Sequence, residues 1–454
     1  MYLSKFKNFI ITFLIFLAIY QTTGLWFENF STHSLFNLIN NKSEDTDIQK
    51  DTLYLAESIL INTGNNKFIR KYNNISNTDY KKVFDEAIYL CIKNGDFSYI
   101  QYFDIKEVLN KRSIIYTYDF DIKGEDMYKV FNIKANHFSK IDKFDTIIIE
   151  PIIDDKYNIK TIFLETQSLN AYEFKISKEA LGQNILNIIN DFNRLDNKDF
   201  YYISSEESGI SLFSNNQFLP KAKGENFNVN TIEATSPLEQ DGGILLSESE
   251  KYVNVFFENP ITKSSSFINN TYTYNDEDVI VKYYPNSVLE YVKYKSNISI
   301  NNQDSPYNIA IQFLAKDTNI KNEYFLKDYE IDENKTTFYF DYKINNFPII
   351  LSENKKKETD MKSMIEVTVE DNIVSKYKKL VYDFTLKEEY VPVEKSFIEA
   401  IDDFLVNKNS FGDNFNINKM KLVYKFDTIN EPINIKWLIG IEDEAYFENV
   451  TYGG

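Results

Sequence analysis

The sequence predicts an α+β protein: a single N-terminal transmembrane helix followed by an ectodomain of about three modules of antiparallel sheets with packed helices. Three observations support this class. The length, 454 residues, suits roughly three domains. One long uncharged apolar run lies near the N-terminus. The remainder consists of amphipathic helical segments, each followed by several strand-like runs, which is typical of α+β folds.

The composition excludes two classes of protein. Phe, Tyr and Trp make up 16% of the chain, whereas Gly plus Pro are only 22 of 454 residues, so the chain is not of the disordered type. The net charge is 50 − 68 = −18, and the only arginines are Arg70, Arg112 and Arg194. Nucleic-acid binding rests on basic side chains that neutralise phosphates, so we expect no nucleic-acid partner.

Cysteine and histidine are almost absent. A single cysteine, Cys91, excludes an internal disulfide and every cysteine-built metal cluster. Two histidines, His33 and His137, leave little for general base catalysis at neutral pH. Each is interpreted as an ordinary surface or half-buried histidine, and the alternative is that one of them senses pH. The sequence therefore predicts no metal-binding residues and no cofactor.

The N-terminal segment predicts a membrane anchor. Residues 1–8 carry Lys5 and Lys7 and no acid, which predicts a cytoplasmic tail. Residues 9–27 are uncharged, and 19 residues span about 28 Å as a helix, close to the thickness of the hydrocarbon layer. We therefore expect a single-pass protein of the cell membrane with an extracytoplasmic ectodomain.

A cleaved signal peptide is the alternative interpretation of this segment. Its strongly apolar part, residues 9–20, is short enough for a signal sequence. No good Ala-x-Ala site follows, because Ala18-Ile19-Tyr20 ends in a bulky residue and Thr22-Thr23-Gly24 is marginal. An uncleaved anchor is the favoured reading.

A polar stalk over residues 28–50 leads to a predicted N-terminal α+β module, 51–215. It begins with a hairpin around Gly64-Asn65 and continues with a helix capped by Ser76 or Thr78. In that helix Tyr80, Val83, Phe84, Ala87 and Cys91 share one face, so Cys91 reads as a core residue rather than a reactive thiol. Further strands are predicted at 113–122, 145–151, 161–165, 171–176 and 201–205, and a helix at 178–192.

A polar connector, 215–230, separates this module from a predicted central β-rich module, 231–300. Its core segments are 253–257, 271–274, 279–284 and 289–294. The acidic stretch Asn275-Asp276-Glu277-Asp278 joins two of the strands. It is either a hairpin turn or a calcium loop, and it lacks the EF-hand spacing and glycine, which favours the turn.

The C-terminal α+β region, 301–454, shows a possible internal repeat. A helix opens at Ser305-Pro306, with proline at the first helical position, and strands follow at 336–342, 365–369 and 378–384. A second helix starts near 393–396, with strands at 419–426, 433–439 and 445–450. The predicted apolar stripe of this second helix consists of Phe397, Ile398, Ile401, Phe404 and Leu405.

A search for catalytic motifs yields no catalytic residues. Nucleophile, metalloprotease and phosphate-loop patterns lack supporting context, and Asp241-Gly242-Gly243 reads as a turn. Adjacent acids such as Asp154-Asp155 and Asp402-Asp403 leave a paired-carboxylate glycosidase possible by residue type. With 68 acidic residues, solvent-exposed faces explain such pairs better.

Three regions together resemble the YycH family of extracytoplasmic regulators. They are the single anchor at 9–27, a middle stretch, and a C-terminal set of short motifs. The middle stretch comprises Val253–Pro260, Tyr272–Asp276 and Leu289–Tyr291. The C-terminal set comprises Asn345–Ile349, Leu422–Tyr424, Pro432 and Lys436–Ile439. The chain departs from the family pattern where glycine is expected, in the 275–278 turn and at Asn346, so it resembles a divergent member.

The resemblance implies a non-enzymatic regulator of a WalK-type sensor histidine kinase that controls cell-wall metabolism. It implies the kinase and a YycI-like membrane protein as partners, with contact partly through the membrane helix, where Gln21, Thr22 and Thr23 are polar. These three residues alternatively mark only the membrane interface. The alternative function is a membrane-tethered wall-active hydrolase or wall-polymer-binding protein.

Overall fold

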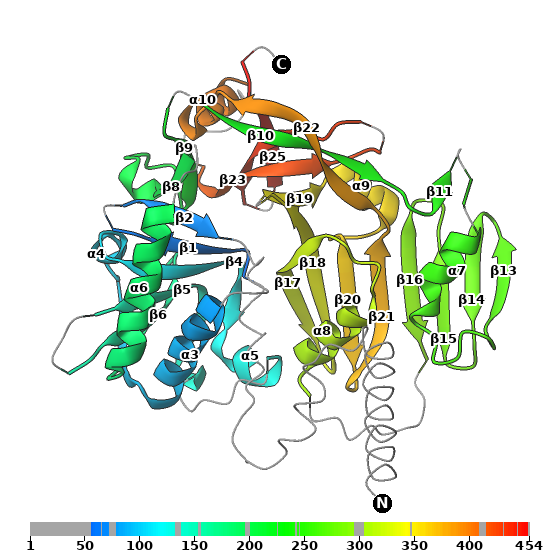
Figure 1. Cartoon of the computed structure of the whole chain (residues 1–454), viewed down its shortest axis with the longest axis horizontal. Helices are drawn as coiled ribbons and strands as arrows, with labels where there is room; N and C mark the ends of the chain where they lie inside the picture. Colours follow the sequence, from blue (N-terminus) through cyan, green and yellow to red (C-terminus); the bar gives the residue numbers. More distant parts are fainter. Residues whose placement is uncertain are drawn as a thin grey trace, which may run out of the picture. The chain divides into compact units, whose positions relative to one another are not determined.

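The structure is a computed structural model, drawn in Figure 1. It describes residues 56–64, 66–71, 79–131, 138–152, 156–195, 200–224, 226–240, 243–244, 246–294, 304–345, 347–407, 415–429, 431–442 and 444–452. The predicted tail, anchor and stalk lie outside these residues. Among the helices described, none is long and apolar enough to cross a membrane.

The N-terminal part folds around an antiparallel sheet that has nine strands among the described residues. Buried β-branched and aromatic residues dominate its central strands; β6, for example, is buried along its whole length. In spatial order the strands are β3 (Asp96–Ile100), β7 (Asn170–Ile176), β6 (Ile159–Glu165), β5 (Lys143–Pro151), β4 (Ser113–Lys123), β1 (Ser58–Asn62), β2 (Phe68–Lys71), β8 (Phe200–Ser204) and β9 (Phe218–Ala222).

Helices cover both faces of this sheet. α3 (Asp79–Asn94) and α6 (Glu179–Leu195) pack side by side on one face, as Figure 1 shows. α4 (Ile105–Leu109) closes a second apolar cluster on the other face. Short helices α5 (Gly124–Lys129), η2 (Phe138–Lys140) and η3 (Ser205–Glu207) complete this part. The predicted face of α3 is confirmed, since Phe84, Ala87 and Cys91 are buried.

The C-terminal part is built on a second sheet, of twelve strands within the described residues. Among its described strand pairs, only β19–β23 is parallel. The path runs β13 (Ser264–Ile268), β14 (Thr271–Asn275), β15 (Val279–Tyr283), β16 (Val288–Lys293), β21 (Ile373–Leu380), β20 (Ile365–Glu370), β18 (Lys335–Ile344), β19 (Phe347–Leu351), β23 (Ile417–Phe426), β24 (Ile435–Ile441) and β25 (Glu444–Asn449), and β17 (Glu323–Asp332) pairs with β18.

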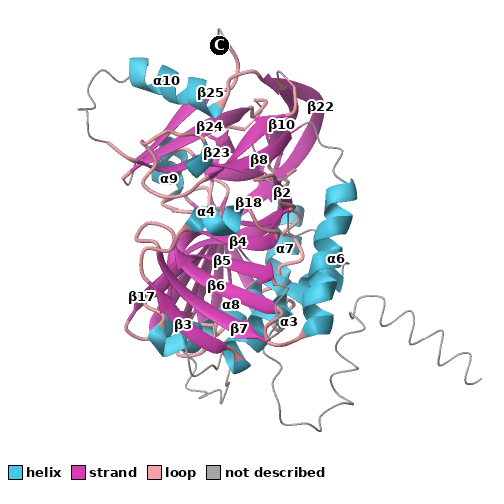
Figure 2. Cartoon of the chain, turned by 90° about the vertical axis from the view of Figure 1, so that its left-hand side faces the viewer, coloured by secondary structure: helices cyan, strands magenta, loops and turns pink. Residues whose placement is uncertain are grey.

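The described residues of this part also form four helices and two ribbons. α8 (Pro306–Lys316) lies on β20 and β21, and α10 (Phe397–Asn407) on β24 and β25. The others are α7 (Leu246–Asn254) and α9 (Glu353–Thr359). Figure 2 colours helices and strands separately and shows the long ribbon of β10 (Phe227–Thr235) and β22 (Asp383–Val393); β11 (Glu239–Gln240) and β12 (Gly243–Ile244) form a short one.

Three local predictions are wrong. Residues 253–257 are not a strand: Val253 and Asn254 end α7, and a turn follows. The expected connector 215–230 contains β9 and the start of β10. In α10, Phe397, Ile401 and Phe404 are buried as predicted, whereas Ile398 and Leu405 are exposed.

Candidate functional site: a charged cleft

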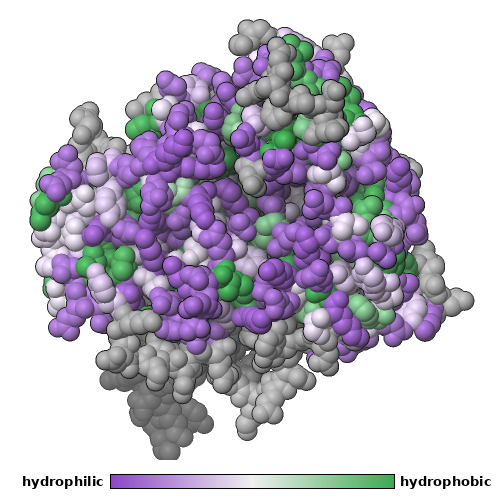
Figure 3. All heavy atoms as spheres, turned by 180° about the vertical axis from the view of Figure 1, so that it is seen from behind, coloured by the Kyte–Doolittle hydropathy of each residue, from purple (hydrophilic) through white to green (hydrophobic). Residues whose placement is uncertain are grey.

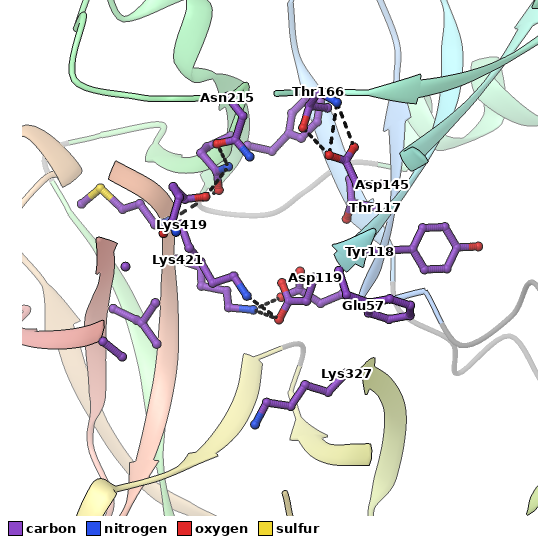
Figure 4. Close-up of a pocket in the computed structure, with 18 of the residues that line it drawn as sticks. Glu57, Thr117, Tyr118, Asp119, Asp145, Thr166, Asn215, Lys327, Lys419 and Lys421 are labelled. Carbon is purple, nitrogen blue, oxygen red and sulfur yellow. Dashed lines mark hydrogen bonds and ion pairs between the residues drawn. The ribbon is translucent and has the colours of Figure 1, made fainter. Parts of the chain in front are cut away.

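A polar cleft of about 560 Å³ lies between the nine-stranded sheet and the C-terminal strands. One wall comes from Glu57, the residue before β1, from β4 and from β5. The opposite wall comes from β17, β18 and β23–β25, and the segment 214–218 lines a further side. Figure 4 shows charged and amide side chains from these elements directed toward one another. The cleft is therefore assembled from residues far apart in the sequence.

Lys421 is the central group of the cleft. Its Nζ lies 2.5 Å from a carboxylate oxygen of Glu57 and 2.7 Å from one of Asp119. Lys419, two residues earlier on the same face of β23, lies 3.2 Å from Asp119. Figure 4 shows both lysines extending from β23 toward these two acids. All three groups of the Lys421 cluster, Glu57, Asp119 and Lys421, are nearly excluded from solvent.

The irregular part of β4 explains how Asp119 reaches this position. The pairing of β4 with β5 shifts register between Thr117 and Ile122, so the intervening residues are released from the regular ladder. Such irregularities redirect side chains near functional sites. Asp119 lies inside the shifted stretch and is thereby available to the lysines of β23.

The charges and the burial of the cluster shift the pKa of each member. Burial alone would raise the pKa of Asp119, but the ammonium groups of Lys419 and Lys421 hold that pKa well below its usual range. Burial and the neighbouring charge of Asp119 raise the pKa of Glu57. The lysine is kept charged, because the two acids outweigh the effect of burial and raise the pKa of Lys421. The cluster thus concentrates charge where little water can screen it.

Asp145 forms a second polar centre at the cleft wall. Its carboxylate accepts hydrogen bonds from the backbone N–H of Thr166 at 3.2 Å and from the Thr166 hydroxyl at 2.5 Å. Burial raises the pKa of Asp145 to about 6, although these hydrogen bonds act in the opposite direction. The carboxyl group therefore changes charge in the mildly acidic range.

Amide groups of the segment 214–218 connect the cleft to β23. The Gln217 side chain donates to the carbonyl of Asn418 at 3.2 Å and accepts from the Met420 N–H at 3.4 Å. The Ser214 N–H donates to the Ile417 carbonyl at 3.0 Å. All but the first residue of this segment lie in the expected connector, 215–230, and the segment lines the cleft.

The chemistry of the cleft suits polar binding and cohesion between the two sheets. Glu57 and Asp119 share one lysine, because Lys421 Nζ lies within ion-pair distance of both carboxylates. Glycosidase carboxylates flank a space that holds substrate or water. A buried lysine lies between Glu57 and Asp119 instead.

The residues singled out from the sequence do not converge on this cleft. Cys91 is fully buried, and burial raises its thiol pKa to about 12. Asp402 is exposed, and Asp403 pairs with Lys395 at 2.6 Å. Asp276 accepts from the N–H groups of Asp278 and Val279, which confirms the hairpin turn. His33, His137, Asp154-Asp155, Asp241-Gly242 and the 9–27 segment lie outside the described residues.

Within the described residues, no group of three or more His, Cys, Asp or Glu side chains is arranged to hold a metal ion. The sequence reasoning missed Glu57, Asp119, Asp145, Lys419 and Lys421. One signal was present: Lys421 interrupts the apolar run Met420–Val423, and a charge inside a buried strand requires a partner.

Comparison with solved structures shows the fold. The chain is similar to YycH from Bacillus subtilis, with a TM-score of 0.54 and 14% identity over 88% of this chain and 97% of that one. The chain has a YycH-like fold, as the sequence resemblance predicted.

Two further similarities are weaker. An uncharacterized protein from Eubacterium rectale has a TM-score of 0.32 at 12% identity, covering 58% of this chain and 91% of its own. The Bacillus megaterium YpeB C-terminal domain has a TM-score of 0.26 at 13% identity, covering 46% and 95%. No family model and no curated protein sequence matches the chain.

Proposed function

We propose that the chain is a membrane-anchored extracytoplasmic regulator of a two-component sensor histidine kinase that controls cell-wall metabolism, and that it acts without enzymatic activity. The observation that carries the proposal is the YycH-like fold, which extends over 88% of the chain. The motifs that resemble the YycH family support it independently, because they occur in the family's order along the chain. The expected partners are the kinase and a YycI-like membrane protein.

The proposed mechanism is protein contact, partly within the membrane. Lys5, Lys7 and the uncharged run 9–27 support an uncleaved anchor with a cytoplasmic N-terminus. Gln21, Thr22 and Thr23 provide polar groups near its outer end, and such groups hydrogen-bond between helices in lipid. The ectodomain holds the second set of contacts.

A membrane-tethered wall hydrolase or wall-polymer-binding protein is the second candidate, and the cleft is the observation that favours it. Its volume of about 560 Å³ is large enough for a small ligand. Against it stand the buried lysine between Glu57 and Asp119 and the net charge of −18, which repels anionic wall polymers.

One experiment separates these candidates. Residues 9–27 are replaced by an unrelated spanning sequence, and a reporter driven by the kinase's response regulator is measured. We expect the replacement to abolish regulation, because the ectodomain stays tethered while the contacts within the membrane are lost. N-terminal sequencing of the membrane-extracted protein checks that the anchor is retained.

Single substitutions, measured with the same reporter, test whether any one residue outside the anchor is needed for regulation. Asp145→Asn in the cleft, Cys91→Ala, His33→Ala and His137→Ala are each expected to leave regulation within about twofold of the wild type. Regulation that survives the anchor replacement but is lost in a stably expressed Asp145→Asn variant would contradict the proposal and favour a ligand-binding or catalytic cleft.

A further inference from the structure

The outer edge of β13 is the least protected strand edge in the described part of the chain. β13 ends the large sheet and pairs only with β14, through Ser264↔Asn275 to Ile268↔Thr271. All five of its side chains are exposed. Its outward backbone N–H and C=O groups therefore face solvent in the geometry of a strand that is ready to pair.

Other edges of the two sheets carry the features that discourage pairing. β25 contains Glu444 and Glu448, β17 contains Asp328, Glu330 and Asp332, β3 contains Asp96, and β9 contains Pro220 and Lys221. Charges and proline on an edge strand are common protections against edge-to-edge association. β13, Ser-Ser-Ser-Phe-Ile, has neither.

The absence of charge extends over the whole β13–β14 hairpin. Residues 264–275 contain no charged side chain, whereas 26% of the chain is charged. Phe267 is 54% exposed, Ile268 66% and nearby Ile261 93%. Figure 3 shows that the hydrophobic groups on the face in view are scattered over a mainly hydrophilic surface. An uncharged edge with three exposed apolar side chains differs from that general pattern.

Contacts within the hairpin and with α7 fix the conformation of β13 and β14. Asn269 and Asn270 both have positive φ, 51° and 59°, as the tight turn of a two-residue hairpin requires. The rings of Phe267 and Tyr272 lie 4.4 Å apart, and the Tyr274 hydroxyl is 2.7 Å from Ser249 Oγ on α7. Little conformational freedom remains to be lost when another strand is added.

We propose that β13 pairs antiparallel with β13 of a second copy of this chain, across a two-fold axis. The charge distribution selects this occupant. A second copy brings a net charge of −18, so contacts through acidic edges are repelled, and the two-fold axis places each strand against itself. An uncharged edge is what self-pairing of an acidic chain requires, since like charges directly opposite in a sheet are destabilising.

The first test uses full-length protein in mild detergent, with single cysteines at Ser264, Ser265 or Ser266 and, as the control, at Ser98 on β3. Native Cys91 is fully buried and does not interfere. Directly opposed residues of an antiparallel pair have Cα atoms about 4.5–5.5 Å apart, within disulfide range. We expect oxidation to cross-link copies at one or two adjacent β13 positions. Equal cross-linking at Ser98→Cys would overturn the proposal.

The second test places a positive charge on the edge. In sedimentation velocity, Ser266→Lys is expected to raise the dissociation constant of the dimer roughly tenfold or more, because two ammonium groups meet across the axis. The matched variant Ser98→Lys, a serine on the β3 edge, is expected to dimerise as the wild type does. A wild-type chain that stays monomeric at all concentrations overturns the proposal and leaves the edge to a strand of another protein.

Discussion

At the residue scale, Asp145 couples the cleft to pH. Its carboxyl has a pKa of about 6 in the folded protein, raised by burial, against about 3.9 for a free aspartate. Between these pH values the folded state binds more protons than the unfolded state. The free energy of unfolding therefore falls as the pH rises from about 4 to 6, by up to about 3 kcal/mol through this group.

Asp145→Asn tests this pH dependence. The asparagine keeps an oxygen that can accept from Thr166 but has no charge to bury. We expect urea unfolding of the variant to show a smaller loss of stability between pH 4.5 and 7 than the wild type, and greater stability at pH 7. The exposed Asp402→Asn serves as the control and should keep the wild-type slope. An unchanged slope in Asp145→Asn would refute the assignment.

The cleft could not be predicted from the sequence, because its residues are far apart along the chain and form no recognisable motif. Glu57 and Lys421 are separated by 364 residues, and Asp119 and Lys421 by 302. In a chain with 68 acidic residues, Glu57 and Asp119 are indistinguishable by sequence from solvent-exposed acids. Only Lys421, inside an apolar run, gave a local sign of burial. Cys91 was predictable because helical periodicity alone places it on a buried face.

At the element scale, segments with strong local signals were predicted well. α8 begins as expected, with Ser305 Oγ accepting from the Asn308 N–H at 3.2 Å and with Pro306 at the first helical position. α9, whose sequence is Glu-Asn-Lys-Lys-Lys-Glu-Thr, was missed because it has no apolar periodicity. β17 was missed because the second half of the strand is largely exposed and charged.

Residues 253–257 were wrongly predicted as a strand, and they show that an apolar run alone does not determine the backbone conformation. Short apolar runs fit a strand or a buried turn equally well. Phe256 follows α7, and its ring lies 5.7 Å from Tyr291, 5.7 Å from Phe313 and 5.6 Å from Tyr377. It therefore fills a gap between α8 and the sheet, and no ladder hydrogen bonds hold it.

Phe256→Ala measures this packing role. We expect the variant to lose about 3–4 kcal/mol of unfolding free energy, because a buried aromatic ring leaves a cavity among three others. Phe256→Leu should lose less, since it fills part of that space. Val406→Ala, at a side chain that is 72% exposed, is the control and should change stability by less than about 0.5 kcal/mol. Chemical denaturation compares them, and a Phe256→Ala loss as small as the control's would argue against the aromatic cluster.

At the scale of the whole molecule, the two sheets are joined through aromatic contacts, such as Phe120 with Tyr329 and Phe131 with Tyr307, and through polar contacts. The Lys421 cluster links β23 to β1 and β4, and segment 214–218 adds amide hydrogen bonds to β23. The large sheet also crosses the predicted boundary at residue 300, because β16 pairs with β21. The division of residues 51–454 into three modules, and the relation between the α8 and α10 halves, remain predictions.

Lys421→Met tests whether the Lys421 cluster holds the two sheets together. Methionine keeps the buried stem but leaves Glu57 and Asp119 without their shared cation, and removing one partner of a buried ion pair typically costs about 3–5 kcal/mol. Lys421 lowers the pKa of both Glu57 and Asp119, so in the variant these acids should take up protons at a higher pH than in the wild type. The loss of stability relative to wild type should therefore be larger at pH 8 than at pH 5.

Two further variants make the Lys421 prediction specific. Lys129→Met removes an exposed lysine that lies 2.6 Å from Glu125, and such surface pairs contribute no more than about 1 kcal/mol. Adding Glu57→Gln to Lys421→Met removes one of the uncompensated acids and should restore part of the loss. Hydrogen exchange should show faster exchange on β1, β4 and β23 in Lys421→Met, while α3 and α6 keep wild-type protection. A Lys421→Met variant as stable as Lys129→Met, with unchanged exchange on those strands, would mean that other contacts join the two sheets.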